Sequence, residues 1–392
     1  NCTFCGQCIE ACPTGALQEK DTTDIVWEKL KDPDTYVVVQ TAPAVRVALG
    51  EEFGMPIGTN VTGKMVASLK RLGFDKVFDT NTGADFTIME EATEFIERFQ
   101  KNDHLPMITS CSPGWVRYIE MNYPENLKHL SSCKSPHEMF GAVIKTYYAA
   151  KQKINPEKLF VVSVMPCIAK KFERQREELK DNGLYDVDCV ITTRELARMI
   201  KQANIEFVEL EEEKFDNPMG EATGAGAIFG VTGGVMEAAL RTVSETLTGK
   251  NLEKIEFEEV RGKTGIKRAT IPIGNKQVKV AVAHGLGNAK IIMEEIKSGK
   301  ADYQFVEIMA CPGGCIMGGG QPIKSAKIRE TVDVRAKRAE AMYTIDEKSK
   351  IRESHKNPVL QKIYREFLGE PGGHLAHELL HTTYQKREKY RI

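Results

Sequence analysis

The sequence predicts an α/β protein built from two lobes of mostly parallel β-sheet flanked by helices, with a small cysteine-rich segment at the N-terminus. Short apolar runs alternate with stretches of helical period along most of the chain, which is the pattern of βαβ units and a parallel sheet. Two such series follow one another, and three of the strand-like runs end in turns that contain cysteine. The length of 392 residues leaves room for two or three domains, at roughly 100–200 residues each.

The first series occupies residues 21–157 and begins with the apolar run YVVV. Each apolar run is too short for a helix and is followed by a segment whose apolar residues recur every three or four positions. The expected strands are 36–39, 76–80 and 106–110, and the expected helices are 63–72, 85–99, 114–122 and 136–152.

The second series occupies residues 158–331 and begins with LFVVSVM. The highly charged tail, 332–392, reads as helical, and the apolar spacing of Leu360, Ile363, Tyr364 and Phe367 suits packing on a lobe. We expect one large domain, 21–392, with lobes of roughly 21–157 and 158–331. In the second lobe the expected strands are 159–165, 187–192, 278–285 and 303–309, and the expected helices are 193–203, 224–242 and 288–298.

Composition excludes several classes of partner. The chain has 54 Lys plus Arg against 55 Asp plus Glu, so its net charge of -1 gives no overall attraction to nucleic acid or to an anionic membrane. No run of about 18 apolar residues predicts a membrane span. The chain opens with Asn1 and Cys2 and shows no basic-then-apolar leader. We therefore expect a cytoplasmic protein that lacks some upstream residues.

Four of the ten cysteines lie within the first twelve residues. Cys2, Cys5, Cys8 and Cys12, with Pro13, spell C-x2-C-x2-C-x3-C-P, the run that binds 4Fe-4S clusters in bacterial ferredoxins. Thiolates at this spacing favour iron-sulfur chemistry, and a structural zinc knuckle is the alternative. In two-cluster ferredoxins the fourth cysteine serves the other cluster, and no partner run occurs here. Residues 1–20 thus read as a partial ferredoxin-like segment with Cys2, Cys5, Cys8 and Cys12 as its candidate ligands. Two alternatives stay open: Cys12 belongs to this cluster, or it is left without a cluster and Cys2, Cys5 and Cys8 lack a fourth ligand.

Three further cysteine motifs follow expected strands. They are TSCSPGW at 109–115, MPCIAKK at 165–171 and EIMACPGGCIMGGGQP at 307–322. The carboxyl ends of strands in open α/β sheets line the crevice in which such folds bind ligands. The glycines of the third motif let the backbone approach a bulky group closely, although a disulfide or an anion-binding loop would also suit its C-x3-C pair.

The three motifs, in this order, resemble the signature segments of iron-iron (FeFe) hydrogenases. GAGAIFGVTGGVMEAALR and TGKMVASLKRLGFDKVFD are similar to that family as well, and the resemblance covers essentially the whole chain. It implies an H-cluster, which is a 4Fe-4S cubane joined through one cysteine thiolate to a di-iron unit that carries CO, cyanide and a bridging dithiolate amine.

The resemblance also implies roles for individual residues. Cys167, Cys311 and Cys315 would be cubane ligands, with Cys315 the bridging one, and Lys170 would hydrogen-bond a cyanide. The family often has serine where Ala44 stands and glutamine where His137 stands. The residues expected to surround the di-iron unit are Pro43, Ala44, His137, Met165, Pro166 and Met309.

The first motif departs from the family. Where the family usually has adjacent cysteines, the first a proton relay and the second a cubane ligand, this chain has Cys111 followed by Ser112. A serine oxygen is a harder ligand and matches iron-sulfur iron poorly. Three alternatives stay open: Ser112 ligates as an alkoxide, Cys111 turns in to ligate and the relay is altered, or that iron is labile.

A row of carboxylates fits a proton path. Glu91, Glu94 and Arg98 are spaced i, i+3 and i+7, which places them on one face of the helix expected at 85–99. By pattern alone, a solvated charged face is the simpler interpretation. In the resembled family the path runs from the relay cysteine through a glutamate, a serine and a second glutamate, and Glu91, Ser131 and Glu94 match that order.

Competing motifs are weaker. His377 to His381 fits the H-E-x-x-H pattern of zinc proteases, but a C-terminal packing helix is the simpler interpretation. Residues 58–65 are nearly a P-loop, yet Met65 stands where a Ser or Thr would bind Mg²⁺. The glycines at 224–234 do not have dinucleotide-binding spacing. Cys133 and Cys189 read as buried thiols.

We therefore expect a hydrogenase that interconverts protons and H₂ by 2H⁺ + 2e⁻ ⇌ H₂. Electrons would pass through the N-terminal 4Fe-4S cluster to or from a ferredoxin, a partner redox subunit or an NAD-linked acceptor, and maturation proteins would supply the di-iron unit. The alternatives are an H₂-sensing or redox-sensing relative and a non-catalytic iron-sulfur protein. No nucleic-acid or membrane partner is expected.

Overall fold

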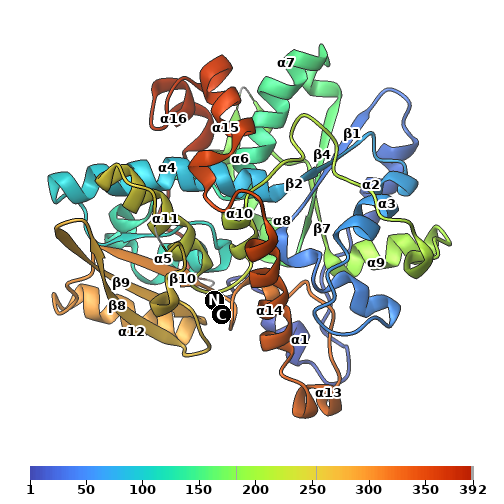
Figure 1. The fold of residues 1–392 in the computed structure, drawn as a ribbon. Coiled ribbons are helices and arrows are strands. Elements are labelled where there is room, and N and C mark those ends of the chain that lie inside the picture. Colours follow the sequence, from blue (N-terminus) through green and yellow to red (C-terminus); the bar gives the residue numbers. More distant parts are fainter. Residues whose placement is uncertain (182, 253, 390–392) are drawn as a thin grey trace.

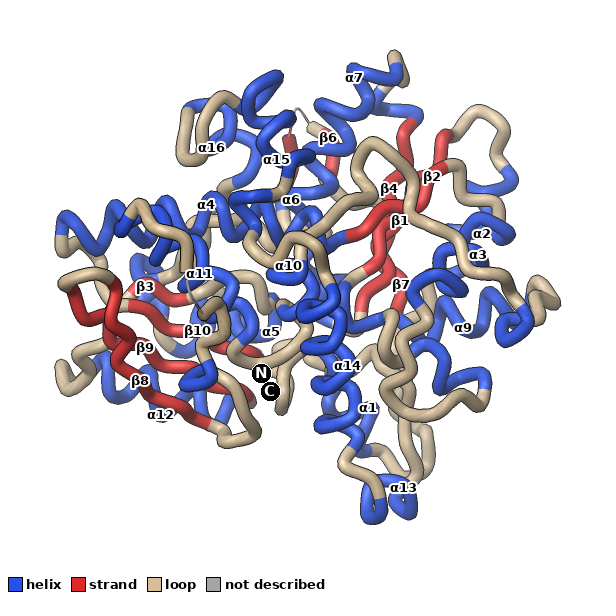
Figure 2. Tube along the Cα trace, in the orientation of Figure 1, coloured by secondary structure: helices blue, strands red, loops and turns tan. Residues whose placement is uncertain are grey.

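The computed structural model describes residues 1–181, 183–252 and 254–389. Two separate four-stranded sheets lie on opposite sides of the molecule, with helices around and between them (Figure 1; strands are red in Figure 2). All strand pairings in one sheet are parallel, and in the other sheet only the pairing of one edge strand is antiparallel. The α/β class predicted from the alternating pattern is therefore confirmed.

The elements have the following bounds. The strands are β1 (Tyr36–Thr41), β2 (Lys76–Asp79), β3 (Met107–Ile108), β4 (Leu159–Met165), β5 (Lys180–Asp181), β6 (Leu184–Tyr185), β7 (Cys189–Thr192), β8 (Ile266–Ile273), β9 (Lys276–His284) and β10 (Phe305–Met309). The helices are α1 (Gln7–Ala11), α2 (Thr23–Lys31), α3 (Thr62–Leu72), α4 (Thr80–Lys101), α5 (Pro113–Asn122), α6 (Pro136–Val143), α7 (Ala149–Gln152), α8 (Ala169–Glu173), α9 (Thr193–Gln202), α10 (Gly224–Ile228), α11 (Gly234–Thr248), α12 (Leu286–Lys297), α13 (Ala326–Thr331), α14 (Val334–Lys348), α15 (Pro358–Ile363) and α16 (His374–Leu380).

The first sheet has the strand order β2-β1-β4-β7. Its central strands β1 and β4 are almost wholly apolar and buried, as strands covered by helices on both faces must be. Val38 pairs with Lys76 of β2 on one side and with Val161 of β4 on the other. This sheet forms the centre of the largest hydrophobic core.

The second sheet has the order β3-β10-β9-β8. The edge strand β8 runs antiparallel to β9 and was not expected from the sequence, because Lys267, Arg268 and Pro272 interrupt its apolar pattern. Gly274, at φ 59°, makes the turn that joins the two strands. The predicted strand 106–110 is reduced to the two paired residues of β3.

The two sheets do not divide at the expected lobe boundary near residue 158. Strand β1 pairs along its length with β4, and β3 pairs with β10, so each sheet takes strands from both halves of the chain. Which strands pair depends on the apolar surface that the pairing buries, and the order of apolar runs in the sequence does not show this.

Three helices differ most from their predicted bounds, among them the one expected at 136–152, which is α6, a π-helical stretch over Ile144–Tyr148 and α7. The helix expected at 85–99 starts at Thr80, because the Asp79 side chain accepts a hydrogen bond from the Asn81 amide and caps it. The single helix expected at 224–242 is two helices, α10 and α11, since Gly233 adopts φ 89° between them.

Helix α4 joins the two cores. Phe86 packs into the core of the first sheet, whereas Ile88, Ala92 and Phe95 belong to a core that includes strands of the second sheet. Glu90 and Glu91 therefore lie in the middle of the molecule and are fully buried.

Buried ion pairs connect the C-terminal tail, residues 332–392, to the rest of the molecule. Arg338 of α14 donates to both oxygens of Glu51 at 2.8 Å, and Arg241 of α11 donates to the two oxygens of Asp346 at 2.9 and 2.8 Å. Leu360, Ile363 and Tyr364 enter the first core and Phe367 packs against it, as the apolar spacing predicted.

The N-terminal segment lies against the loop that follows β10. A Cβ on Gly319 would lie 2.3 Å from the carbonyl oxygen of Cys5, so the glycine permits this contact. The Arg117 side chain donates to the Cys2 carbonyl at 2.9 Å and lies over the rings of Phe4 and Phe172. Within the described residues, no helix is long and apolar enough to cross a membrane.

Candidate active site

The carboxyl ends of β1, β3, β4 and β10 face a common interior space between the two sheets. Two adjoining cavities occupy it, with empty volumes of about 530 and 400 Å³. Of the residues expected at the site, the first cavity is lined by Pro43, Cys111, His137, Met165, Pro166, Cys167, Lys170, Met309 and Cys315. The second is lined by Cys5, Cys111, Ser112, Cys167, Lys170, Met309, Cys311 and Cys315.

The two cavities share three cysteines but differ in their other lining residues. Cys111, Cys167 and Cys315 line both, whereas Cys311 and Ser112 line only the second. Ala44 lines neither: it packs behind Gly230, and its carbonyl oxygen accepts a hydrogen bond from Gln321 at 2.9 Å.

The thiols fit an iron-sulfur group. Burial raises the pKa of Cys167 and Cys311, and it raises the pKa of Cys315 to about 12. A thiolate at these positions therefore requires positive charge, which a bound iron group supplies. The second cavity is ringed by several soft sulfur donors, and the first cavity, which Met165 and Met309 line, adjoins it. This pair of cavities suits a group made of two joined parts.

A buried charged network supports Lys170. Its ammonium donates to the carbonyl oxygen of Cys111 at 3.2 Å and to Glu173 at 2.7 Å, and His137 Nε2 lies 2.7 Å from the same Glu173 oxygen. Burial alone would lower the pKa of Lys170, but the charge of Glu173 outweighs it and the net shift is upward. Burial opposes ionisation of Glu173 too, yet Lys170 and His137 lower its pKa to about 2.

Sequence reasoning missed Glu173 in this network. It lies three residues after Lys170 on α8, so the i, i+3 spacing was the available signal. Its carboxylate keeps Lys170 charged in the interior and fixes the direction of its ammonium group.

Cys111 and Ser112 point to different surroundings. Ser112 caps the N-terminus of α5, and its hydroxyl accepts a hydrogen bond from the Ala310 amide at 3.2 Å. Burial and the charge of Glu91 raise the pKa of the Cys111 thiol well above its usual value. Cys111 thus stays a neutral thiol beside the first cavity.

The carboxylate row exists and is mostly buried. The Ser131 hydroxyl donates to Glu94 at 2.8 Å, and Arg98 donates to the other oxygen of Glu94 at 2.6 Å. Neither Glu91 oxygen has a hydrogen-bond partner among the described residues. Burial and the charge of Glu94 raise the pKa of Glu91 to about 8. The simpler interpretation, a solvated charged face, is wrong for Glu91, which is 0% exposed.

The N-terminal cysteines are more open. Cys2 and Cys8 are exposed, and Cys5 is half-buried beside the second cavity. Hydrogen bonds from backbone amides, the largest effect being that of Leu17, together with the Thr14 side chain lower the pKa of Cys12 to about 6.

Two competing motifs find no support. The rings of His377 and His381 stack at 4.5 Å, and Nε2 of His381 is bonded to Glu90. The segment resembling a P-loop follows a short 3-10 helix rather than a strand, and the helix after it begins at Thr62.

The fold and the site define an iron-sulfur oxidoreductase domain with a buried, cysteine-ringed centre. Residues 35–319 match the family described as "Iron only hydrogenase large subunit, C-terminal domain", residues 332–387 match "Iron hydrogenase small subunit", and residues 1–18 match "4Fe-4S binding domain". The chain therefore belongs to the iron-only (FeFe) hydrogenase family, with an H-cluster and a 4Fe-4S cluster as its cofactors.

Named relatives agree with this assignment. The chain is 52% identical to the NADP-reducing hydrogenase subunit HndD of Solidesulfovibrio fructosivorans over 99% of this chain and 66% of that protein. It is 50% identical to iron hydrogenase 1 of Clostridium pasteurianum over 95% of this chain and 65% of that protein. The chain thus spans just under two thirds of the length of these relatives.

Solved structures and a more distant relative complete the comparison. The [FeFe]-hydrogenase HydA1 from Chlamydomonas reinhardtii superposes with a TM-score of 0.82 at 43% identity, covering 94% of this chain and 99% of that one. Protein NAR1 of Arabidopsis thaliana is 32% identical over 98% of this chain and 85% of its own length.

Proposed function

We propose that the protein catalyses the reversible reduction of protons to H₂. One observation carries the proposal. Cys111 lines both cysteine-ringed cavities, and the side chains of Glu91, Ser131 and Glu94, which can carry protons, lead from it toward the surface. Such a row has no use in a site that only stores iron and sulfur.

The roles of the cofactor-binding residues follow from their positions. Cys167, Cys311 and Cys315 would hold the cubane in the second cavity. The resemblance to the family makes Cys315 the ligand that bridges to the di-iron unit, and its position at both cavities is compatible with that role. Lys170 would direct its charge to an anionic ligand such as cyanide, while Met165 and Met309 wall the space against water. When bound, the iron group supplies the redox chemistry that joins two protons and two electrons.

The proton path uses this chain's own groups. Glu91 is protonated at neutral pH because its pKa is raised to about 8, so it can donate a proton toward Cys111. It can be reprotonated through the Ser131 hydroxyl, which donates to Glu94. Arg98 holds Glu94 in place at the outer end of the row.

Electrons would enter through the N-terminal segment, 1–20. Cys2, Cys5 and Cys8 would hold its 4Fe-4S cluster, with Cys12 assigned to no cluster of this segment. Cys5 lies beside the second cavity, so the path between the two iron-sulfur groups would be short.

The electron donor or acceptor would be a ferredoxin, a partner redox subunit or an NAD-linked protein. Maturation proteins would supply the di-iron unit. We also propose a cytoplasmic location and a single catalytic domain over residues 21–392.

Similarity to the cytosolic Fe-S cluster assembly factor narfl of Xenopus tropicalis, 30% identical over 99% of this chain and 84% of that protein, favours a second candidate, a non-catalytic iron-sulfur protein. One experiment separates the two: the protein is produced with maturation proteins, and infrared spectra and H₂ evolution with a strong chemical reductant are recorded. We expect bands of metal-bound CO and cyanide together with H₂ evolution.

A matched pair of variants locates the signal. Cys315→Ala should lose the bands and the turnover but keep the N-terminal cluster, whereas Cys189→Ala, a thiol buried in β7, should keep all three. Full iron loading without CO and cyanide bands in the unmodified protein would favour the non-catalytic candidate.

A further inference from the structure

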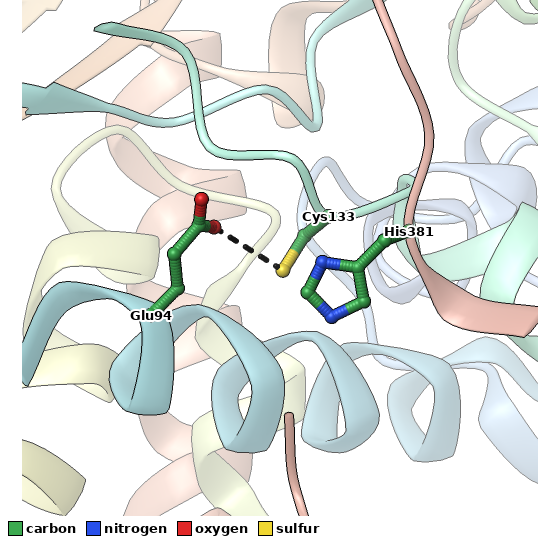
Figure 3. Close-up of side chains that lie close together, drawn as sticks. All are labelled: Glu94, Cys133 and His381. Atoms are coloured by element: carbon green, nitrogen blue, oxygen red, sulfur yellow. Dashed lines mark hydrogen bonds between the residues drawn. The ribbon is translucent and has the colours of Figure 1, made fainter. Parts of the chain in front are cut away.

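Three metal-binding side chains meet at the outer end of the carboxylate row. Glu94 comes from α4, Cys133 from the segment before α6, and His381 from the residue that ends α16 (Figure 3). One ligand atom of each lies within 4.8 Å of those of the other two. Cys133 and His381 are buried, and Glu94 is nearly so.

The backbone holds two of these residues side by side. Cys133 and His381 form an isolated antiparallel bridge. The Lys134 amide donates to the Leu380 carbonyl at 2.8 Å, and the Thr382 amide donates to the Ser132 carbonyl at 2.7 Å. The thiol and the imidazole are therefore set in place by the fold, and no flexible loop has to close to bring them together.

The hydrogen bonds of His381 leave one nitrogen able to bind a metal. Glu90 already accepts from the Tyr364 hydroxyl and from the Gly372 amide. The third partner of Glu90, His381 Nε2 at 3.0 Å, therefore carries a hydrogen, and Nδ1 has the lone pair. A carboxylate behind a histidine is the arrangement that orients zinc-binding imidazoles in proteins.

Glu94 also presents a defined oxygen. Its Oε1 accepts a hydrogen bond from Arg98 at 2.6 Å, while Oε2 lies 3.9 Å from Cys133 Sγ. Oε2 is thus the atom that faces the thiol. Because Nδ1 of His381 has the lone pair, the single hydrogen of the Ser132 hydroxyl is donated to it, over 2.8 Å. The surface cavity beside the cluster is lined by more carboxylates than cations: Glu90, Glu94, Glu97 and Asp103 against Arg98 and Lys101.

We propose that Glu94, Cys133 and His381 form a binding site for one Zn²⁺ ion. A thiolate, an imidazole and a carboxylate are the ligand types that Zn²⁺ prefers, whereas Mg²⁺ and Ca²⁺ prefer oxygen alone. The fourth ligand would be water from the surface cavity that Glu94, Ser132 and His381 line. On binding, the Cys133 thiol loses its proton to solvent, and the Ser132 hydroxyl, 2.8 Å from Nδ1, turns away from that nitrogen.

Zinc at this site would slow proton entry, a consequence that rests on the proposed function. Glu94 Oε2 faces Cys133 and also accepts a hydrogen bond from the Ser131 hydroxyl. A zinc ion on that oxygen therefore competes with the hydrogen bond through which protons would reach Ser131 and Glu91. Binding itself requires no turnover and can be tested separately.

The binding test uses the iron-sulfur-loaded full chain without the di-iron unit, given one equivalent of Zn²⁺ and desalted. X-ray absorption at the zinc edge should show one sulfur at about 2.3 Å and nitrogen or oxygen ligands at about 2.0–2.2 Å. Cys133→Ser should remove the sulfur, and His381→Gln, which keeps hydrogen-bonding groups, should weaken zinc affinity by about tenfold or more. Cys189→Ser, at a buried thiol in β7, should change neither.

The inference is overturned if the bound zinc has no sulfur ligand, if it has two or more, which would indicate the N-terminal cysteines, or if the sulfur persists in Cys133→Ser. In the fully loaded enzyme, Zn²⁺ should lower H₂ evolution relative to each variant's own zinc-free rate, and less so in Cys133→Ser. Zinc binding without inhibition would overturn the blocking role alone. An enzyme without any turnover would count against the proposed function and leave the spectroscopic test intact.

Discussion

At the scale of single residues, Glu91 shows how burial sets chemistry. Its carboxyl group has no partner among the described residues and lies beside Glu94, so its pKa rises from the ordinary 4.5 to about 8. A group with a pKa near the working pH can both give up and take back a proton, which an exposed glutamate at pH 7 does poorly.

Replacing Glu91 tests this directly. Glu91→Gln keeps the shape of the side chain but cannot titrate, so turnover should fall by about two to four orders of magnitude while the CO and cyanide infrared bands persist. Near-normal turnover would remove Glu91 from the path. Glu97→Gln, on the exposed part of the same helix, is the matched control and should change little.

The same substitution has a signature in stability. Because the folded protein keeps a proton on Glu91 up to about pH 8 and the unfolded chain releases it near 4.5, the wild type should lose stability as pH rises between these values. Glu91→Gln should reduce that slope, as measured by melting temperatures across the range. An unchanged slope would show that the pKa of Glu91 is not raised.

Ser112 is the second residue whose chemistry can be tested alone. If it occupies the fourth ligand position of the cubane, its hard oxygen should leave one iron weakly held, and Ser112→Cys should make the cluster resist mild oxidation. Iron counts before and after oxidation compare the two proteins. Equal retention would instead favour Cys111 as the ligand and remove it from the proton path.

At the scale of elements, the glycines after β10 determine how the N-terminal segment sits. Gly319 approaches the backbone of Cys5 and Gly6, and Gly318 that of Pro166, so closely that a Cβ would clash at either position. The contact of Gly319 holds Cys5 beside the cavity that the cubane would fill. The proposed route for electrons therefore depends on how this short segment packs.

Adding one methyl group should disturb that route. In Gly319→Ala the new Cβ would lie 2.3 Å from the Cys5 carbonyl oxygen, so the segment must shift. We expect turnover with a protein donor to fall several-fold more than turnover with a small dye. Gly287→Ala, in α12 with no atom within 4 Å of its Cβ, is the control. Equal losses with both donors would point to general destabilisation.

At the scale of the whole molecule, the tail behaves as a second piece held by buried charges. Helix α13 has no buried residue and separates the stretch that matches the large-subunit family from the stretch that matches the small-subunit family. The ion pairs of Arg338 with Glu51 and of Arg241 with Asp346 join the two pieces. Breaking such a buried pair from one side costs about 3–5 kcal/mol.

The pieces should therefore assemble when made separately. Residues 1–325 and 332–392, produced together with a tag on the smaller piece, should copurify one to one and retain the infrared bands. Arg241→Ala in the larger piece should abolish copurification, because it removes the buried ion pair between the pieces and leaves Asp346 paired only with Arg352 of its own piece. Lys337→Ala, on an exposed side chain, should not. A larger piece that stays soluble and alone would show that the covalent link is needed.

The sequence by itself determined the α/β class, the cysteine motifs at strand ends and the placing of Glu91, Glu94 and Arg98 on one face of a helix. These depend on local patterns: periodicity shows an element's type, and a strand end followed by cysteine shows where a ligand binds. Only the tertiary structure decided which strands share a sheet, that Glu173 supports Lys170, and that Cys133 meets His381 across 248 residues of chain. Those neighbours depend on which surfaces bury each other best, and the energy of that choice is spread over contacts between residues far apart in the chain.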